Sequence, residues 1–191
     1  MRFLRGGPPP FQTALAMIGA KPGQTVVLAG AGDGRLAAQL AQVTGLNGRT
    51  LVVDAPDATA RAEVVATAAG ALIEPAPGRP DALPVDAGMA DVVVLHQVVG
   101  APGVDTAAVA AEALRALRPG GRAVAIGGTP PAGLVASLTR SGRGAPGVTF
   151  DPDRLREAFT IAGFRAARLL AEAEGVTYVE GVRARDASPD A

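Results

Sequence analysis

The residues with the clearest chemical potential form a short glycine loop. Gly30-Ala31-Gly32-Asp33-Gly34 stands between a short β-branched apolar run and an Ala/Leu-rich segment, as in a loop that joins a strand to a helix. Glycines in such a loop let backbone N–H groups approach a ligand closely, and the helix N-terminus behind them favours negative charge. The loop therefore predicts a ligand-binding turn.

Asp54 adds a second group to this predicted site. It lies twenty residues beyond Gly34, at the end of the next expected strand, where a carboxylate can accept hydrogen bonds from both ribose hydroxyls. Together the loop and the carboxylate indicate a nucleoside ligand. The alternative is that the glycines only form the tight turns of a doubly wound fold.

The spacing of the loop narrows the choice of nucleoside. A nicotinamide-binding fingerprint reads Gly-x-Gly-x-x-Gly, but Arg35 occupies the position of the third glycine when the count starts at Gly30. The chain has Gly-x-Gly-x-Gly instead, and no Gly-Lys-Ser/Thr of a P-loop occurs. These patterns argue against NAD and ATP.

Composition limits the other kinds of site. The 191 residues fit one domain, 48% of them are hydrophobic and 19% are charged, which is typical of a globular protein. The formal net charge is zero, which argues against binding nucleic acid through a strong positive field. The absence of cysteine and a single histidine exclude a disulfide scaffold and a multi-histidine metal centre. No apolar run is long enough to span a bilayer, so a soluble cytoplasmic protein is expected.

Strands and helices alternate along the chain and must position the loop and Asp54. Apolar runs predict strands at 25–28, 50–54, 71–74, 91–95 and 124–126. Helical spacing and capping residues predict helices at 11–18, 36–43, 59–69 and 107–117, and another beginning at 152. Residues 164–170 and 176–182 are expected to form a closing hairpin. The alternation favours a doubly wound α/β sheet of parallel strands with one antiparallel strand at the end.

Several segments in this order resemble the class I S-adenosylmethionine-dependent methyltransferases, in particular the small-molecule type with a bare domain. The similarity extends from about Gly23 to Val182, nearly the whole chain. It is carried by the glycine loop with its preceding strand, by Asp54, by the approach to the fourth strand, by a Leu-Arg-Pro-Gly-Gly-Arg turn, and by the last helix: 26–34, 54, 83–94, 114–122 and 150–164.

The resemblance implies a Rossmann-like seven-stranded sheet in the order 3-2-1-4-5-7-6, with strand 7 antiparallel and helices on both faces. It also implies one domain over 1–191. Within it, 1–22 would be an N-terminal helical segment, 23–128 the cofactor-binding half, and 129–185 the substrate-side half with the hairpin.

The same resemblance implies S-adenosylmethionine as the cofactor. The loop glycines would hold its amino-acid end, Asp54 its ribose and Asp81 its adenine; the full expected set is Gly30, Ala31, Gly32, Gly34, Asp54, Ala55, Asp81 and Ala82. His96 directly follows the fourth strand, where a general base is expected, and an imidazole has a suitable pKa. The alternative for His96 is that it caps the strand or lines the cofactor pocket. No metal site is expected.

Two positions depart from the family pattern. Leu28 stands where the family has an acidic residue, and Gly78-Arg79-Pro80 stands where it often has Gly-Asp-Ala. Arginine cannot accept the hydrogen bond of the adenine amino group. Two alternatives to methyl transfer therefore stay open: a non-catalytic binding or interaction protein on the same fold, and another Rossmann-type enzyme with a different nucleotide.

The expected partner is a small-molecule acceptor. No Asn-Pro-Pro-Tyr motif follows the fourth strand, and neither nucleic acid nor a membrane is expected as a partner; the oligomeric state is not indicated. Arg140 and Arg143 could meet an anionic substrate or belong to a solvated loop. Phe3 and Phe11 could form a lid over the pocket or pack a helix against the sheet.

Overall fold

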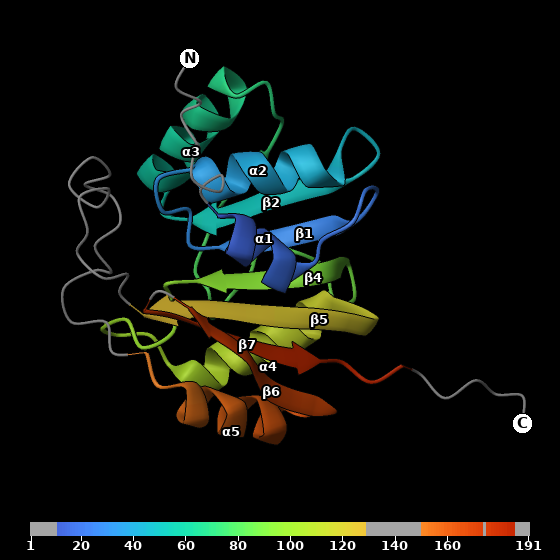
Figure 1. Ribbon diagram of the computed structural model, residues 1–191, viewed down its shortest axis with the longest axis vertical. Helices are drawn as coiled ribbons and strands as arrows, with labels where there is room; N and C mark the ends of the chain where they lie inside the picture. The colour runs from blue at the N-terminus through green and yellow to red at the C-terminus, as the bar shows by residue number, and fades with distance from the viewer. Residues whose placement is uncertain (1–10, 129–149, 174, 186–191) are drawn as a thin grey trace, which may run out of the picture.

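Seven strands form one sheet in this computed structural model, which describes residues 11–128, 150–173 and 175–185. The sheet order is β3-β2-β1-β4-β5-β7-β6 (Figure 1). The strands are β1 (Thr25–Ala29), β2 (Arg49–Asp54), β3 (Glu74–Pro77), β4 (Ala90–His96), β5 (Leu117–Gly128), β6 (Ala166–Ala173) and β7 (Val176–Val182). Phe3, Arg140 and Arg143 lie outside the described residues, so their expected roles stay predictions.

The pairing of the strands confirms the expected topology. β1 is an interior strand that pairs in parallel with both β2 and β4, so that Val26 lies beside Thr50 on one side and Val92 on the other. β2 pairs in parallel with β3, and β4 with β5. β7 is antiparallel to both β5 and β6. This is the order with an antiparallel seventh strand that the family resemblance implied.

Helices cover both faces of the sheet. They are α1 (Gln12–Ile18), α2 (Arg35–Thr44), α3 (Pro56–Ala68), α4 (Thr106–Ala116) and α5 (Pro152–Ala162). Side chains that alternate along the strands point to opposite faces. Val26 and Leu28 pack in the apolar cluster with α1, α2 and α3, whereas Val27 and Ala29 pack in the cluster with α4 and α5. The interior strands of the sheet are therefore buried on both faces, as parallel strands require.

Capping residues begin two of the helices as the sequence predicted. The Asp105 carboxylate accepts a hydrogen bond from the Ala107 N–H at 2.9 Å at the start of α4. Asp151 caps α5 by accepting from Asp153 and Arg154, with Pro152 in the first turn. Such side chains satisfy N–H groups that have no partner within the helix.

The third strand lies further along the chain than expected. The prediction of residues 71–74 was wrong, because β3 runs over Glu74–Pro77. Ala71 is instead buried in a small cluster with Ala38, Ala41 and Ala66 of α2 and α3. β3 is an edge strand, and its two prolines are two residues apart, so their nitrogens point to the same side, away from the ladder.

The fifth strand is longer than the predicted residues 124–126. α4 ends at Ala116, and Leu117 already begins β5, which includes the Pro-Gly-Gly turn expected to separate the two elements. A register shift opposite Ala90 and Val92 absorbs this turn within the ladder. The closing hairpin, by contrast, forms close to its expected place.

Phe11 precedes α1 and packs against the apolar cluster on the α1–α3 face. This contact agrees with the packing alternative for that residue. Within the described ranges, no helix has both the length and the apolar character needed to cross a membrane.

Candidate functional site

Four parallel strands bring the predicted site residues to one edge of the sheet. The glycine loop follows β1, Asp54 ends β2, and His96 ends β4. The loop with Asp81 follows β3. Because the sheet order is β3-β2-β1-β4, these groups follow one another along the edge as the Asp81 loop, Asp54, the glycine loop and His96. Ligands of open α/β sheets bind at this carboxyl edge.

Two of the loop glycines are required by packing within the protein. Gly30 has φ of 95° and Gly34 has φ of 82°, a region that residues with a side chain rarely adopt. A Cβ on Gly30 would lie 2.1 Å from the His96 carbonyl oxygen, and one on Gly34 would lie 2.8 Å from the Ala62 Cα in α3. These two glycines let the loop pack against β4 and α3, whether or not a ligand is bound.

Gly32 differs from the other two glycines because it is exposed at the crest of the loop. The N–H groups of Gly32 and Asp33 donate to no atom of the described chain, whereas the Gly34 N–H donates to the Ala31 carbonyl at 3.0 Å and closes the turn. Two amide donors at the start of α2 are thus available to a polar or anionic group of a ligand, as the predicted cofactor site requires.

Asp54 ties the second strand to the loop. Its Oδ2 accepts a hydrogen bond from the Ala31 N–H at 2.8 Å, and its Oδ1 accepts from the Ala55 N–H at 2.7 Å. The Gly30 N–H donates to the Val53 carbonyl at 2.9 Å beside it. A carboxylate has about four acceptor positions, so each oxygen keeps one for a ribose hydroxyl, and its orientation is fixed in advance.

His96 lies against the glycine loop. Its Nδ1 is 3.2 Å from the Gly30 carbonyl oxygen, and its Cε1 is the nearest atom to a Cβ built on Gly32. Burial lowers the pKa of His96, and the Gly30 carbonyl and the charges of Asp33 and Asp54 oppose this only in part. The imidazole is therefore neutral at pH 7, with its proton on the Nδ1 that faces a carbonyl, which leaves the Nε2 lone pair as an acceptor.

The loop after β3 carries an ion pair that the sequence did not predict. Arg79 donates from Nε to Oδ1 of Asp81 at 2.8 Å and from Nη2 to Oδ2 at 2.7 Å. The hydrogen bonds from Arg79 are the main cause of the lowered pKa of Asp81. The Ala82 N–H donates to the Arg79 carbonyl, and the Gly78 N–H donates to the Asp54 carbonyl at 3.0 Å. The loop therefore lies beside Asp54.

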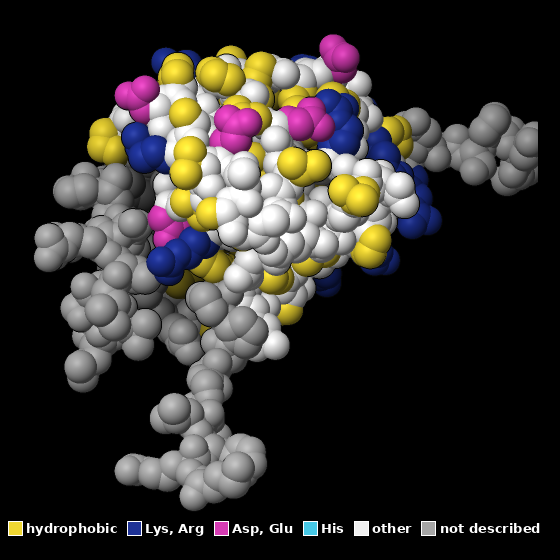
Figure 2. Space-filling model, turned by 90° about the horizontal axis from the view of Figure 1, so that it is seen from above, with side chains coloured by type: hydrophobic (Ala, Val, Ile, Leu, Met, Phe, Trp, Pro, Cys, Tyr) yellow, Lys and Arg dark blue, Asp and Glu magenta, His cyan; other side chains and the backbone are white. Residues whose placement is uncertain are grey.

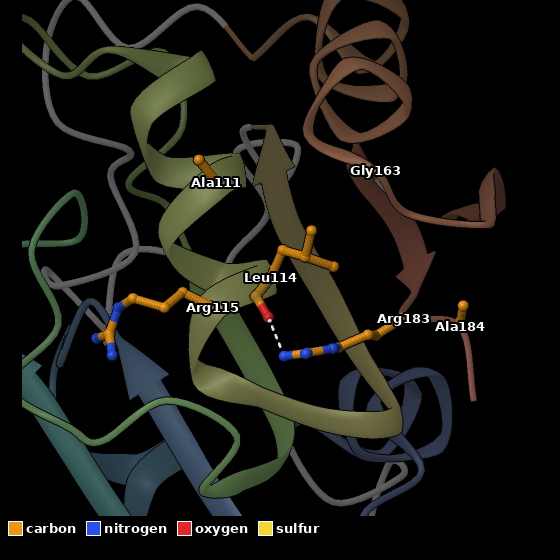
Figure 3. A pocket seen from close by; sticks show the side chains of 6 residues that line it. All are labelled: Ala111, Leu114, Arg115, Gly163, Arg183 and Ala184. Atoms are coloured by element: carbon orange, nitrogen blue, oxygen red, sulfur yellow. Dashed lines mark hydrogen bonds between the residues drawn. The ribbon is translucent and has the colours of Figure 1, made fainter. Parts of the chain in front are cut away.

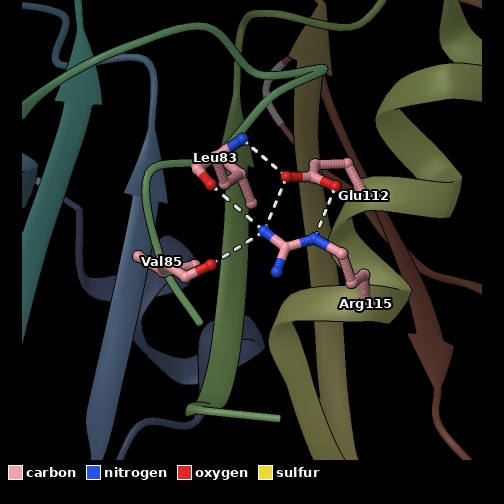
Figure 4. Close-up of polar contacts among 4 residues, drawn as sticks. All are labelled: Leu83, Val85, Glu112 and Arg115. Atoms are coloured by element: carbon pink, nitrogen blue, oxygen red, sulfur yellow. Dashed lines mark hydrogen bonds and ion pairs between the residues drawn. The ribbon is translucent and has the colours of Figure 1, made fainter. Parts of the chain in front are cut away.

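Helix α4 holds the chain between this loop and β4 (Figure 4). Glu112 accepts from the Leu83 N–H at 2.7 Å, while Arg115 donates to the carbonyls of Leu83 and Val85 at 3.1 and 2.9 Å. Arg115 also pairs with Glu112, and this hydrogen bond is the main cause of the lowered pKa of the Glu112 carboxyl. The two side chains fix the path of the segment that leaves Ala82. Sequence reasoning missed this role.

Two further residues bear on the site. Leu28, which replaces the family's acidic residue, is fully buried in the apolar cluster under α2 and offers no polar contact. Gln97, directly after His96, has a positive φ of 58° and donates from Nε2 to the Gly128 carbonyl at 3.1 Å. Its Oε1 is buried and has no hydrogen-bond partner among the residues that the structure describes. Nothing in the sequence signals this, because glycine and asparagine are the usual residues at such φ values.

A separate hollow of about 420 Å³ lies at the opposite edge of the sheet (Figure 3). It is lined by residues of α4 and of the ends of α5 and β7, namely Ala111, Leu114, Arg115, Gly163, Arg183 and Ala184. The Arg183 Nη1 donates to the Leu114 and Leu117 carbonyls at 3.0 and 2.5 Å. Arg183 thus caps the end of α4, and none of the residues that line the hollow is a predicted site residue.

Eighteen acidic and eighteen basic side chains balance each other along the chain. Figure 2 shows basic and acidic side chains interspersed on the face seen from above. Among the residues that the structure describes, no group of three or more His, Cys, Asp or Glu side chains is placed to hold a metal ion.

Comparison with known proteins agrees with this geometry. The sequence profile of the family described as "Methyltransferase domain" matches residues 26–121, just over half of the chain. No curated protein matches the chain.

Solved structures share its fold at low identity. A SAM-dependent methyltransferase from Aquifex aeolicus has a TM-score of 0.74 and 16% identity over 91% of this chain and 89% of its own. A chain from the complex between the Haloferax volcanii Trm112 methyltransferase activator and a methyltransferase described as putative has a TM-score of 0.71 and 21% identity. The match covers 91% of this chain and 88% of that chain. The YcgJ protein from Bacillus subtilis has a TM-score of 0.67 and 14% identity, over 91% and 97%.

Proposed function

Because the chain belongs to the methyltransferase domain family, we propose that it transfers a methyl group from S-adenosylmethionine to a small-molecule acceptor. The observation that carries the proposal is the contact of Asp54 with Ala31, which joins the expected ribose anchor to the glycine loop. Family membership supports the cofactor class, and the geometry of the edge supports the individual residues.

The order of the strand ends suggests how the cofactor lies. The Gly32 and Asp33 amide groups after β1 would receive its amino-acid end, Asp54 after β2 its ribose, and Asp81 with Ala82 after β3 its adenine. Gly30, Ala31, Gly34 and Ala55 shape the same surface from the backbone. The acceptor would then lie on the β4 side, next to His96.

The chain's own residues have a limited chemical task. When bound, S-adenosylmethionine supplies a methyl group already activated by its sulfonium, so positioning the acceptor in line provides much of the rate. Where the acceptor atom carries a proton, the neutral His96 can take it on Nε2, since Nδ1 faces the Gly30 carbonyl. A hydroxyl or amino acceptor would thus give up its proton to His96 as it takes the methyl group, with S-adenosylhomocysteine as the other product.

A non-catalytic binding protein is the second candidate, and a specific observation favours it. Leu28 offers no polar group at the amino-acid end, and Arg79 already holds the Asp81 carboxylate. Leu28 replaces an acidic residue expected to bind the cofactor, and Arg79 occupies the carboxylate expected to bind adenine. On this interpretation, the protein keeps the fold and the glycine loop but catalyses no methyl transfer.

Calorimetric titration with S-adenosylmethionine and S-adenosylhomocysteine tests the proposal. We expect micromolar dissociation constants for the wild type and loss of binding in Asp54→Ala, whereas Asp54→Asn keeps one oxygen for the Ala31 N–H and should bind more weakly. The absence of heat up to millimolar ligand, in a protein with native circular dichroism, would overturn the cofactor assignment. Binding without turnover on a broad panel of acceptors would favour the second candidate.

A further inference from the structure

The ion pair in the loop after β3 bears directly on how the adenosyl group binds. We propose that Arg79 competes with adenine for the Asp81 carboxylate, so that this chain binds adenosyl ligands more weakly at low than at high salt. The inference rests on the proposed function, because it assumes that the adenosyl group lies along the carboxyl edge.

The first step is the place of Asp81. The strands stand in the order β3-β2-β1, and the loops that follow them carry Asp81, Asp54 and the glycine turn, respectively. A ribose held by Asp54 with its amino-acid end towards β1 directs the base towards β3. The hydrogen bond from Gly78 to the Asp54 carbonyl holds the two loops side by side there.

The second step is the state of the Asp81 carboxylate. Both oxygens accept from the guanidinium of Arg79, at 2.8 and 2.7 Å, in the bidentate geometry that is strongest for this pair. The Asp81 side chain is only 17% exposed, so few of its acceptor positions are open to a further donor. The amino group of adenine must therefore share these oxygens or displace the guanidinium.

The third step is the ease of displacement. The Arg79 side chain is 69% exposed, so it can turn into solvent without disturbing the core. Because the arginine is largely exposed, the attraction between the two side chains is modest and is screened by salt. The competition should therefore reduce affinity by a modest factor, about two- to fivefold, rather than abolish binding.

The competition predicts that the affinity for the adenosyl ligand rises, rather than falls, as salt is added. Added salt screens the attraction between Arg79 and Asp81 much more than it affects a hydrogen bond from the neutral adenine amino group. S-adenosylhomocysteine is a zwitterion without net charge, so the general field of the protein affects its affinity little. Its affinity for the wild type should rise with salt, whereas the affinity of an Arg79→Ala variant should stay nearly constant.

Arg49 offers a matched control. It makes the same bidentate pair with Glu74, at 2.8 and 2.6 Å, across the starts of β2 and β3. Those starts lie at the opposite edge of the sheet, away from the predicted site. Arg49→Ala removes a positive charge and a comparable ion pair, so it reports any effect unrelated to Asp81.

The experiment is calorimetric titration with S-adenosylhomocysteine in about 0.02 M and about 0.5 M NaCl for the wild type, Arg79→Ala, Arg49→Ala and Asp81→Ala. We expect Arg79→Ala to bind about two- to fivefold more tightly than the wild type at low salt, Arg49→Ala to behave as the wild type, and Asp81→Ala to bind more weakly. The difference between wild type and Arg79→Ala should vanish at high salt.

Other outcomes overturn the inference in distinguishable ways. Weaker or unchanged binding in Arg79→Ala would mean that Arg79 orients Asp81 or does not affect it. Unchanged binding in Asp81→Ala, with binding still lost in Asp54→Ala, would place adenine elsewhere and leave the proposed function intact. Failure of the wild type to bind S-adenosylhomocysteine at either salt concentration would reject the proposed function and this inference together.

Discussion

Gly30 and His96 contact each other twice at the end of β4. The Gly30 carbonyl oxygen lies 3.2 Å from the imidazole Nδ1, and the Gly30 Cα faces the His96 main-chain oxygen so closely that a Cβ would lie 2.1 Å from it. The glycine loop and the predicted base thus pack directly against each other. Substitutions in either residue should affect both.

Alanine substitutions should separate the structural glycines from the one at the crest. Gly30→Ala meets backbone and requires a disfavoured φ, so we expect the free energy of unfolding to fall by about 2–4 kcal/mol. Gly32→Ala meets only the His96 ring and should lose about 1 kcal/mol. Urea unfolding of both variants measures the difference. Equal losses would mean that the loop does not pack against β4 as described.

His96 should titrate below its ordinary pKa of about 6.5, because burial disfavours the imidazolium. The unfolded chain then binds the proton more readily, so His96 contributes stability above pH 6.5 that is lost as the pH falls through its folded pKa. It is the only histidine of the chain, so its NMR resonances give the pKa without assignment. His96→Asn should remove this part of the acid sensitivity, and a folded-state pKa above 6.5 would contradict the neutral imidazole.

The link between α4 and the loop before β4 should be measurable as stability. Glu112→Ala removes the acceptor of the Leu83 N–H and the partner of Arg115, so we expect a loss of about 1–3 kcal/mol in the free energy of unfolding. The lowered pKa of Glu112 means that this contribution is present near neutral pH and is lost as the pH falls through the folded value. Glu157→Ala, an exposed change on α5, serves as the control.

The stability of the protein should depend on a buried carboxylate of β7, Glu180. Glu180 is nearly inaccessible and lies between Arg122 of β5, at 3.1 Å, and Arg168 of β6, at 2.8 Å. Arg122 also donates to the Met17 and Ile18 carbonyls at the end of α1. Glu180→Ala should lower the free energy of unfolding by about 2–3 kcal/mol, because it leaves Arg122 partly buried and uncompensated.

A double-mutant cycle provides the check on that prediction. Adding Arg122→Met to Glu180→Ala removes the uncompensated charge, so the two losses should not add. Additive losses in urea unfolding would show that Arg122 acts through α1 alone.

Most of the architecture followed from local patterns in the sequence. Asp105 and Asp151 marked helix starts because their carboxylates satisfy free N–H groups, and the run before His96 marked a buried strand. The order of the strands came from the family resemblance rather than from any local pattern. The topology confirmed it.

The features that the sequence did not predict depend on contacts between segments far apart or on the turn of a loop, which the order of residue types does not show. Ala71 looked like part of a strand because it is apolar, but packing between α2 and α3 buries it outside the sheet. The residue type of Arg79 shows that it cannot accept a hydrogen bond from adenine, but its pairing with Asp81 depends on the turn of the loop. Gln97 has a left-handed conformation and hydrogen bonds to Ile126 and Gly128 at the end of β5. Glutamine does not favour this conformation, so the residue type could not predict it.

The contact of Gly30 with His96 also constrains the order of folding. These residues are 66 positions apart, and strand β1 pairs with β4 across the same separation. The loop can contact β2 and α3 earlier, but its contact with His96 cannot form until the chain has returned through β2 and β3. Such long-range closure slows folding, because chain entropy is lost before the contacts form. During synthesis, a nascent chain that ends before residue 96 carries the complete glycine motif but lacks the end of β4, against which Gly30 packs.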